Sequence, residues 1–416
     1  MMMPGVNMKT NTNVMLPLGF IIYALLAFAA SEIILVFHSD MLLIGSFRIP
    51  PIWMGTHFLL LGFAVMVVMG AMYQLVPVAF LTPIWNQTFG FVQFVVTIIG
   101  FTSLTVLLGI APDKAIYGGI ITILGVLMFL VQMLLTIVKQ ENKNIMTAFV
   151  ISALVCFLLT VFAGFLLAWN LAFGTLEMHQ SIFNSHLAFG ITGWFSLVIF
   201  AFSYKLVPMF SLSHGFSMKG AKPAFFTYII GLLILISAFW LHSLTIQTIG
   251  WLLLFVGYSF FITDVWEILK KRLRRKLDKP FSFSILAIFI GFAIHFIALL
   301  LSLFNITNAT IWSWIIFLYI VGWIIFSILG YLYKIVPFLW WTHKYSDRIG
   351  KEKVPTMGEM INEKLSVVLF TLFIVSILLL ITGVLLQFGV VVFMSQFLLA
   401  GTTVAYVISI IKVLFV

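Results

Sequence analysis

Histidines are the residues of this chain whose type and placement fit metal chemistry. His57, His186 and His242 each fall near an end of a long apolar segment. Neutral imidazole binds copper, iron and zinc, so the residue type indicates a metal centre without choosing the metal. An imidazole inside a membrane needs a metal or a polar partner, because an unsatisfied polar group there costs several kcal/mol. A hydrogen bond to a neighbouring helix is the alternative for each of the three.

Two of these histidines stand upstream of a motif that occurs three times. Its copies read GAMYQLVP, AFSYKLVP and GYLYKIVP and end at Pro77, Pro208 and Pro337, which are 131 and 129 residues apart. A glycine stands 15 residues before each proline and an aromatic residue stands 14 before it, namely Gly62, Gly193 and Gly322 and then Phe63, Trp194 and Trp323. A near-constant period of this kind predicts internal repeats.

The third copy of the motif lacks a histidine. His57 lies 20 residues before its proline and His186 lies 22 before its own, whereas Ile315 and Phe317 hold these two positions in the third copy. Neither of those side chains binds a metal. The glycine and the aromatic residue fit a helix that lets a flat group approach its backbone. Ordinary helix packing, for which small residues are the usual solution in membranes, is the alternative.

The composition indicates an integral membrane protein. The chain is 63% hydrophobic and only 8% charged, and its apolar runs of 18 or more residues are typical of membrane-spanning helices. We interpret the net charge of +10 as a membrane effect and expect no nucleic-acid partner. The first apolar run lacks a small-residue cleavage site, so we expect a retained helix there.

The apolar runs predict twelve membrane spans. They fall roughly at 15–37, 52–80, 90–111, 116–138, 146–170, 181–210, 224–243, 246–268, 281–304, 311–340, 366–387 and 392–415. The motif then closes the second, sixth and tenth spans, so that each repeat unit holds four helices, over 15–138, 146–268 and 281–415. The predicted fold is an all-α integral membrane bundle, one domain over 1–416, with three pseudo-symmetric four-helix repeats.

The distribution of lysine and arginine predicts the orientation. These residues gather in one set of loops, notably in the run at 270–276, whereas the opposite set carries little beyond Arg48 and Lys114. Positively charged loops face the cytoplasm, so we expect both termini there, in a multi-pass protein of the plasma or inner membrane. Six of the eight histidines then lie toward the outer face. The run at 270–276 is either a positive-inside anchor or a contact with anionic lipid.

Glu32 and His295 are further ionisable candidates inside the spans. Glu32 is the one carboxylate well within a span, and intramembrane ionisable groups are candidates for function. We expect a proton-relay or ligand role for it, with pairing to a nearby histidine or to the backbone as the alternative. His295 lies near mid-membrane, where it could replace a lost metal ligand. His38 and His179 fall at the interface, where water can satisfy them.

By these motifs the chain resembles subunit I of the heme-copper oxidase superfamily, and most closely the C-type oxidases, the nitric oxide reductases and the NnrS-type membrane proteins. That family has twelve helices in three arcs of four, with metal ligands on helices 2, 6, 7 and 10. Residues 185–190 and 204–208 are similar to its helix 6, and residues 322–337 resemble its helix 10. The resemblance implies that His57 binds a low-spin heme iron and that His186 and His242 bind the second metal.

The departures from this family are equally specific. Its helix 10 carries His-x-His where this chain has Ile315 and Phe317, so we do not expect standard cytochrome oxidase activity. The resemblance implies a membrane protein that binds heme b, copper or both near the outer face, through His57, His186 and His242. Its role would be redox, a response to nitric oxide or oxygen, or metal handling. In one variant, His295 or His38 supplies a missing ligand.

Two other classes of function stay open. A transporter or assembly factor without a chromophore would use the same bundle to pass metal or heme outward. A partner subunit of a respiratory complex would tolerate the lost ligands. The chain has no Cys-x-x-Cys-His heme attachment, so any electron donor must be a quinol or another chain, such as a cytochrome or a respiratory-complex subunit. Membrane lipid is the expected surrounding in every case.

Overall fold

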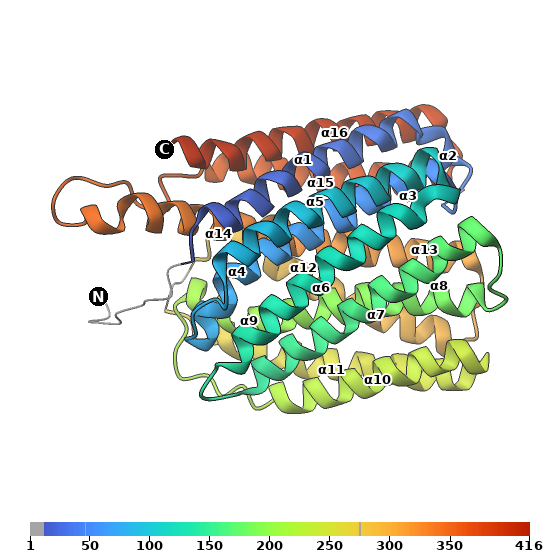
Figure 1. Ribbon diagram of the computed structural model, residues 1–416, viewed down its shortest axis with the longest axis horizontal. Coiled ribbons are helices and arrows are strands. Elements are labelled where there is room, and N and C mark those ends of the chain that lie inside the picture. The colour runs from blue at the N-terminus through green and yellow to red at the C-terminus, as the bar shows by residue number, and fades with distance from the viewer. Residues whose placement is uncertain (1–11, 46, 274–275) are drawn as a thin grey trace.

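The structure is a computed structural model that describes residues 12–45, 47–273 and 276–416. These residues form helices and connecting loops, and their strand-like pairing is limited to one isolated bridge between Ser213 and Arg272. Twelve of the helices are long and apolar enough to cross a membrane. They run side by side along the long axis of the molecule (Figure 1). The predicted all-α, multi-pass bundle is therefore confirmed.

The observed spans follow the predicted ones closely. The first six are α1 (Met15–Phe37), α3–η1–α4 (Pro50–Phe80), α5 (Gln87–Ile110), η2–α6 (Pro112–Val138), α7 (Ile145–Phe173) and α8–η3–α9 (His179–Ser211). The last six are α10 (Ala221–Leu241), α11 (Leu244–Lys270), α12 (Lys279–Leu303), α13–η4–α14–η5 (Ala309–Arg348), α15 (Glu363–Leu385) and α16–η6 (Gly389–Phe415). A short helix, α2 (Ser39–Leu43), lies between the first and second spans.

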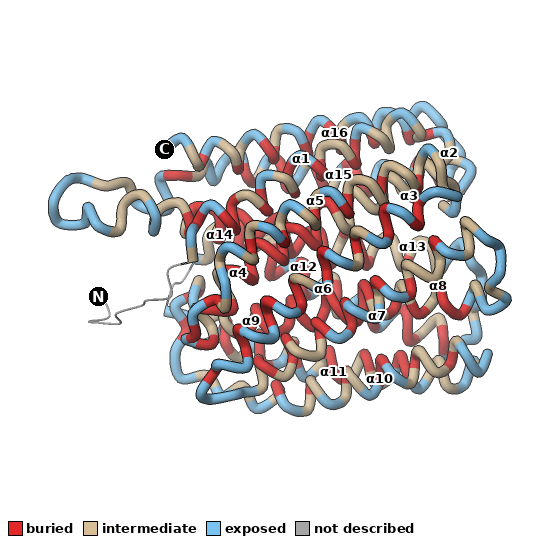
Figure 2. The backbone as a smooth tube through the Cα atoms, in the orientation of Figure 1, coloured by how far each residue is buried: buried red, intermediate tan, exposed pale blue. Residues whose placement is uncertain are grey.

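Three spans form the centre of the bundle. We call them inner helices A (Pro50–Phe80), B (His179–Ser211) and C (Ala309–Arg348). The most apolar stretches of A, B and C are 78%, 89% and 78% buried, against 50% or less for every other span. The buried residues accordingly concentrate in the middle of the molecule (Figure 2). These are the three helices that carry the repeated motif.

Each inner helix contains a π-helical segment at nearly the same distance from its motif proline. The segments are η1 (Phe58–Val65), η3 (Ala188–Phe195) and η4 (Tyr319–Ile325). A π-helix makes i→i+5 hydrogen bonds, is rare, and occurs within α-helices frequently at functional sites. His57 directly precedes η1, and a single residue separates His186 from η3. Two of the three π-helical segments therefore begin beside a histidine.

The motif prolines lie inside their helices. Inner helices A and B continue for three residues beyond the proline. The next residue, Leu81 in A and Leu212 in B, caps the helix with a left-handed φ of 52° and 53°, respectively. The amide of each of these leucines donates to the carbonyl of its motif proline. Inner helix C instead continues from Pro337 to Tyr345. A proline that removes one backbone donor thus stands near the helix end in two copies and not in the third.

The motif glycines pack against neighbouring helices. A Cβ added to Gly62 would lie 2.7 Å from the Cβ of Ala27 on α1, and one added to Gly193 would lie 2.9 Å from the Cβ of Cys156 on α7. A Cβ on Gly322 would meet α12 at 3.1 Å. Small residues permit such close approach of helices in membranes. Helix packing therefore accounts for these glycines.

The aromatic residue that follows each glycine contacts the same neighbouring helix. Phe63 stacks on Phe28 of α1 with ring centroids 4.3 Å apart, and Trp194 stacks on Phe157 of α7 at 4.5 Å. Trp323 lies so close to a glycine of α12 that a Cβ there would approach its indole to 2.8 Å. Inner helices A, B and C thus pack on the first, fifth and ninth spans, respectively, and in each case the motif glycine and the aromatic residue after it make the contact.

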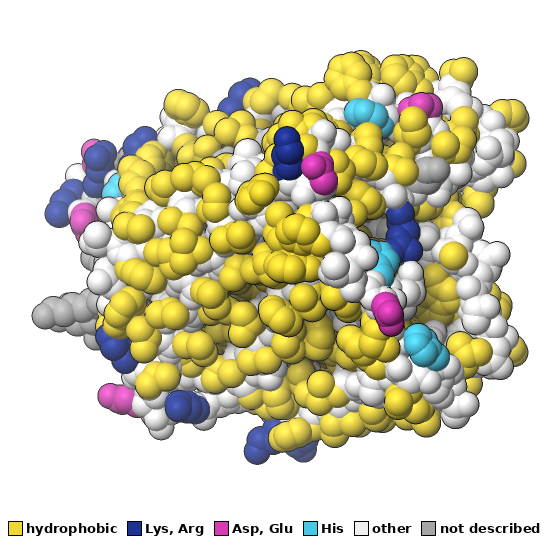
Figure 3. Space-filling model, turned by 45° about the vertical axis from the view of Figure 1, so that its right-hand side comes forward, with side chains coloured by type: hydrophobic (Ala, Val, Ile, Leu, Met, Phe, Trp, Pro, Cys, Tyr) yellow, Lys and Arg dark blue, Asp and Glu magenta, His cyan; other side chains and the backbone are white. Residues whose placement is uncertain are grey.

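The two ends of the bundle differ in charge. Basic side chains gather at the end where α1 begins and α16 ends, which is the left end in Figure 1. Figure 3 shows several of these lysine and arginine side chains on its left side. The opposite end of the described chain has Arg48 and Lys114 as its lysine and arginine residues. Within the basic run, Arg274 and Arg275 lie outside the described residues. The end with few basic residues is the one at which the candidate site opens.

The contact between Gly62 and Ala27 can be tested by exchanging its two residues. We expect Gly62→Ala to lower the free energy of unfolding by about 1–3 kcal/mol, because it forces extra volume into a packed contact. The double variant Ala27→Gly/Gly62→Ala removes the opposing Cβ and should recover most of that loss. Unfolding in mixed detergent–SDS micelles, followed by circular dichroism, measures both. Unchanged stability of Gly62→Ala would contradict the packing interpretation.

Candidate functional site

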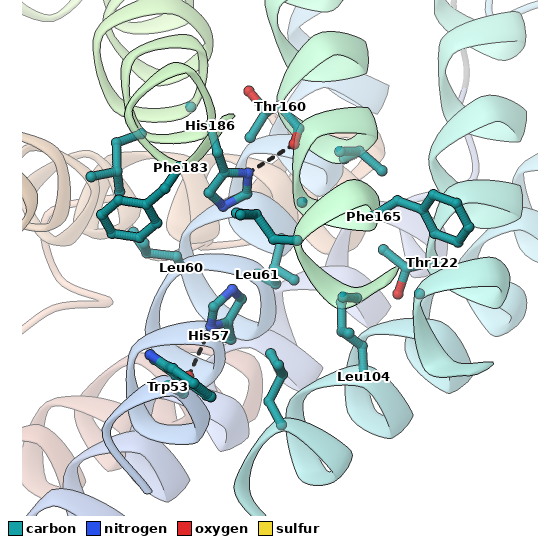
Figure 4. Close-up of a pocket in the computed structure, with 18 of the residues that line it drawn as sticks. Trp53, His57, Leu60, Leu61, Leu104, Thr122, Thr160, Phe165, Phe183 and His186 are labelled. Carbon is teal, nitrogen blue, oxygen red and sulfur yellow. Dashed lines mark hydrogen bonds between the residues drawn. The ribbon is translucent and has the colours of Figure 1, made fainter. Parts of the chain in front are cut away.

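A cavity lies between inner helices A and B and the helices α5, α6 and α7. Its volume is about 180 Å³, and its lining reaches Arg48 at the end of the bundle with few basic residues. Leucine, isoleucine, valine and aromatic side chains make up most of the walls. His57 and His186 enter it from opposite sides (Figure 4). The structure therefore brings together the two histidines that precede the first two motif copies.

His57 is held by its own helix. Its Nδ1 lies 2.8 Å from the carbonyl oxygen of Trp53, one turn earlier in inner helix A. The side chain is partly exposed although it sits within the bundle, because one face of the ring borders the cavity. The hydrogen bond to Trp53 fixes the direction of the ring.

His186 is held by a different helix. Its Nδ1 lies 2.9 Å from the carbonyl oxygen of Thr160 on α7. The Thr160 hydroxyl bonds back to the carbonyl of Cys156 in its own helix. The ring also lies directly against Gly164, where an added Cβ would come within 2.9 Å of the imidazole Cε1. The close approach of α7 and inner helix B therefore depends on a glycine at this position.

The two hydrogen bonds determine which nitrogens are available for binding. A carbonyl oxygen only accepts, so Nδ1 of each neutral ring carries the proton and Nε2 keeps its lone pair. In Figure 4 the free nitrogens of His57 and His186 face one another across the cavity. Metal-binding histidines commonly donate their second ring nitrogen to a carbonyl or carboxylate, which fixes the tautomer and the ring orientation. Two imidazoles are thus oriented as ligands from opposite sides of one space.

The mouth of the cavity is positively charged. The Arg48 guanidinium donates to Gln180 Oε1 at 3.0 Å and to His179 Nε2 at 3.1 Å, and it lies 4.3 Å from the Phe183 ring centroid. The ion pairs found among the described residues do not include Arg48. An arginine without a carboxylate partner at the mouth of an apolar cavity attracts anionic groups.

Two buried polar atoms in the cavity walls have no hydrogen-bond partner. They are the indole Nε1 of Trp194 and the hydroxyl of Thr122, and both residues are almost fully buried, with 1% and 3% of their surface exposed. A buried polar group without a partner costs free energy.

The other histidines near this end lie apart from the pair. His242 ends α10 in a left-handed conformation, is exposed, and does not line the cavity. His38 bonds to a carbonyl of its own helix, and His179 stands at the mouth beside Arg48. The described residues contain no group of three or more histidine, cysteine or acidic side chains placed to hold one metal ion. Among the described residues, no third histidine, cysteine or acidic side chain therefore lies close enough to share a metal ion with His57 and His186.

His295 is buried in a separate polar cluster. Its Nδ1 lies 2.7 Å from the Gly291 carbonyl, and its Nε2 lies 3.1 Å from the Tyr228 hydroxyl and 3.2 Å from the Tyr319 hydroxyl. Both ring nitrogens thus have protein partners. A role for His295 as a replacement metal ligand stays a prediction.

Glu32 and Phe317, one of the two substituted ligand positions, lie on the far side of inner helix A from the first cavity. A second cavity, of about 100 Å³, is lined by Glu32 and Phe317. Ile315 is buried nearby in inner helix C and does not line either cavity. Phe317 therefore occupies space next to a cavity, in the place where the resemblance implied a ligand.

Sequence reasoning missed the residues that orient the pair. Trp53 and Thr160 act through backbone carbonyls, and Gly164 acts through its lack of a side chain, so none of them carries a signal in residue type. Arg48 carries one, because it is one of two basic residues in the loops that we predict to lie opposite the lysine- and arginine-rich ones. Its isolation there could have identified it as a site residue.

Comparison with known proteins adds no relative: no protein-family model matches the chain, and no curated protein is significantly similar to it. The resemblance to heme-copper oxidases therefore depends on the motifs and on the twelve-helix arrangement.

The charge at the mouth can be tested by cysteine labelling. In a Cys156→Ala background, we expect Leu60→Cys, which lines the cavity, to react severalfold faster with an anionic methanethiosulfonate than with a cationic one. Arg48→Gln and high salt should both reduce that ratio, because they remove or screen the attracting charge. Met66→Cys, a position that is fully buried, is the unreactive control. A ratio that does not depend on Arg48 would contradict this account.

Proposed function

We propose that this protein holds a transition-metal centre between His57 and His186, with heme iron as the favoured metal and a bare copper ion as the alternative. One observation carries the proposal: both Nδ1 atoms are hydrogen-bonded to backbone carbonyls, which leaves both Nε2 lone pairs facing one cavity. Imidazole nitrogen suits iron and copper alike. The role that we propose is electron transfer or metal handling in the membrane.

Three features of the site favour heme as the form in which the metal is held. The walls are apolar, as a macrocycle requires, and Arg48 at the mouth can pair with carboxylate groups. Trp194 adds a buried donor without a protein partner. The cavity volume of about 180 Å³ is only slightly larger than the ~150 Å³ that admits benzene. A porphyrin is several times larger than benzene, so it fits only if wall side chains move apart and part of the ring extends into the open mouth toward Arg48; the volume by itself favours the smaller copper ion.

The chain's own residues have definable tasks in this proposal. His57 and His186 bind the metal, and the carbonyls of Trp53 and Thr160 orient them. The apolar walls exclude water, and Arg48 positions anionic substituents at the mouth. A heme held by two imidazoles supplies one-electron transfer. This assignment differs from the resemblance, which pairs His57 with a ligand from inner helix C.

Copper is a specific alternative because it needs the same two nitrogens and less room. The cavity accommodates a single ion without any movement of the walls. A copper site would leave Arg48 and the Trp194 indole without a role, and for this reason we place it second. A transporter, assembly factor or respiratory partner subunit would need neither metal.

We also propose the finer organisation that the sequence indicates. Three four-helix repeats, over 15–138, 146–268 and 281–415, are supported by the recurring contacts of the motif glycine and aromatic residue with the first, fifth and ninth spans. The gathering of basic residues at one end supports cytoplasmic termini. The cavity then opens on the outer side of a plasma or inner membrane. A divergent relation to subunit I of heme-copper oxidases is consistent with the three repeats and with the cytoplasmic termini.

A reduced-minus-oxidised visible spectrum of the detergent-purified protein, with metal analysis of the same sample, tests the proposal. We expect a Soret band and b-type peaks that are lost in both His57→Ala and His186→Ala, because each removes one of two ligands. His343→Ala, at the basic end, should keep the full spectrum. Copper without heme, lost in the same two variants, would assign the alternative. Neither heme nor metal would overturn both assignments.

A pair of alanine variants separates loss of the ligand from loss of the fold. Gly164→Ala pushes against the His186 ring, since its Cβ would lie 2.9 Å from Cε1, whereas Gly119→Ala on the facing wall meets only Phe165 at 3.6 Å. We expect the first to weaken or shift the metal's absorption and the second to leave it unchanged. Size-exclusion chromatography and circular dichroism should give the same result for both. Equal spectra of the two variants would count against His186 as a ligand.

A further inference from the structure

The second cavity, of about 100 Å³, lies between inner helices A and C and the helices α1, α15 and α16. Inner helix A separates it from the first cavity, because Leu59 faces the second cavity and Leu60 faces the first. Its lining reaches Phe47, in the loop between α2 and α3. The proposed metal centre makes no use of this space, so a ligand bound here would be independent of the metal.

One buried carboxyl group distinguishes this cavity. Glu32 on α1 is 4% exposed, and its Oε2 accepts a hydrogen bond of 2.7 Å from the amide Nε2 of Gln396 on α16. The described residues provide no hydrogen-bond partner for its other oxygen, Oε1. Those that line the cavity also include no lysine, arginine or histidine. A carboxyl group in such surroundings needs a cation or a proton to neutralise it.

The walls favour an organic cation as that partner. They carry five aromatic side chains, those of Phe28, Phe47, Trp314, Phe317 and Phe373. Aromatic rings attract cations through the negative charge of their faces, and aromatic-lined sites bind organic ammonium ions. A proton on Glu32 would make no use of these rings.

Hard metal ions do not suit the same walls. Besides Glu32, the described residues of the lining that have a side-chain oxygen are Thr56 and Gln396. Calcium takes six to eight oxygen ligands, and magnesium needs six in octahedral geometry. The lining is therefore too poor in oxygen for either ion, whereas an ammonium group needs only a few acceptors for its N–H donors.

The volume limits the size of the ligand. A cavity of ~150 Å³ admits benzene, which has six carbon atoms. By proportion, the second cavity has room for about four non-hydrogen atoms. Methylammonium and ethylammonium fall within this limit, and a six-membered ring does not. A primary ammonium group can also form a charge-assisted hydrogen bond with Oε1, which is stronger than a bond between neutral groups.

We propose that the second cavity binds a small primary ammonium ion, which donates to Glu32 Oε1 and places its short alkyl part among the aromatic rings. Gln396 holds the carboxylate in place through Oε2. Two sources carry this chemistry: a free small amine, and the ethanolamine head group of a membrane lipid, which ends in the same ammonium group. Glu32 is then a binding residue for a cation, and the proposal assigns it no proton transfer.

Saturation-transfer NMR with ethylammonium chloride, on the delipidated protein in detergent at mildly alkaline pH, tests the site. We expect saturable binding with a Kd of about 1 mM, because a ligand of three non-hydrogen atoms makes few contacts. Ethanol has the same number of non-hydrogen atoms and a neutral donor, and it should bind about tenfold more weakly because it lacks the charge. Potassium ion has the charge without N–H donors and should not displace ethylammonium at equal concentration.

Three variants identify the residue and the cavity. Glu32→Gln keeps the size of the side chain and an acceptor oxygen but removes the charge, and we expect it to weaken ethylammonium binding about tenfold. Leu59→Phe adds volume to the second cavity and should abolish binding, whereas Leu60→Phe adds it to the first cavity and should keep binding. The metal spectrum should respond in the opposite way to the two phenylalanine variants, so failure of either proposal is visible without the other. Circular dichroism verifies that all three fold.

Nanodiscs separate the two sources of the ammonium group. Phosphatidylethanolamine has a primary ammonium group, and phosphatidylcholine has a fully methylated one without N–H donors. Equal binding of ethylammonium in the two lipids would assign a free amine. Weaker binding in phosphatidylethanolamine would assign the head group, if native mass spectrometry also shows that this lipid stays on the unmodified protein and is lost from Leu59→Phe.

The assignment is wrong if ethylammonium does not bind saturably in detergent, or if ethanol or potassium ion binds as tightly as ethylammonium. It is also wrong if Glu32→Gln or Leu59→Phe retains full affinity. Binding that is lost in Leu60→Phe instead would place the cation in the first cavity and would contradict the proposal.

Discussion

Inside a bilayer a polar group has no water to bond with, and this constraint governs both the fold and the site. It requires that the backbone N–H and C=O groups form hydrogen bonds with one another, and helices meet this requirement within each span. It also requires a partner for each buried imidazole. His57 meets the requirement with a carbonyl of its own helix and His186 with a carbonyl of α7. Because both bonds use Nδ1, the same constraint leaves both Nε2 atoms directed into one cavity.

The spaces around the three inner helices are used in three different ways. The space between A and B contains the two histidines, and the space between A and C contains Glu32. The space between B and C is filled by His295 with Tyr228, Tyr258 and Tyr319. The Tyr228 and Tyr319 hydroxyls contact Nε2 of the histidine, and the Gly291 carbonyl contacts its Nδ1. An arrangement of similar helices therefore yields two cavities and one packed polar core.

Inner helix A lies between the two cavities and contributes wall residues to both. Its residues 53, 57, 60 and 61 face the first cavity, and 56 and 59 face the second. The π-helical segment η1 begins directly after His57, where the helix is contacted by α1 through Gly62 and Phe63. The close packing on α1 fixes the position of inner helix A, and therefore of the residues that it contributes to both cavities. A change at the motif glycine is therefore expected to reach both.

The sequence by itself determined the number and approximate bounds of the twelve spans, because the length and hydropathy of an apolar run are local properties. It also identified the motif and singled out His57 and His186. Only the tertiary structure decided that these two meet while His242 does not, and that Thr160 orients one of them. The physical reason is that lipid and core are both apolar, so the pattern along a helix does not reveal which face meets its neighbours. Arg48, Gly164 and the cavity beside Glu32 depend on contacts between helices far apart in the chain, which packing alone establishes.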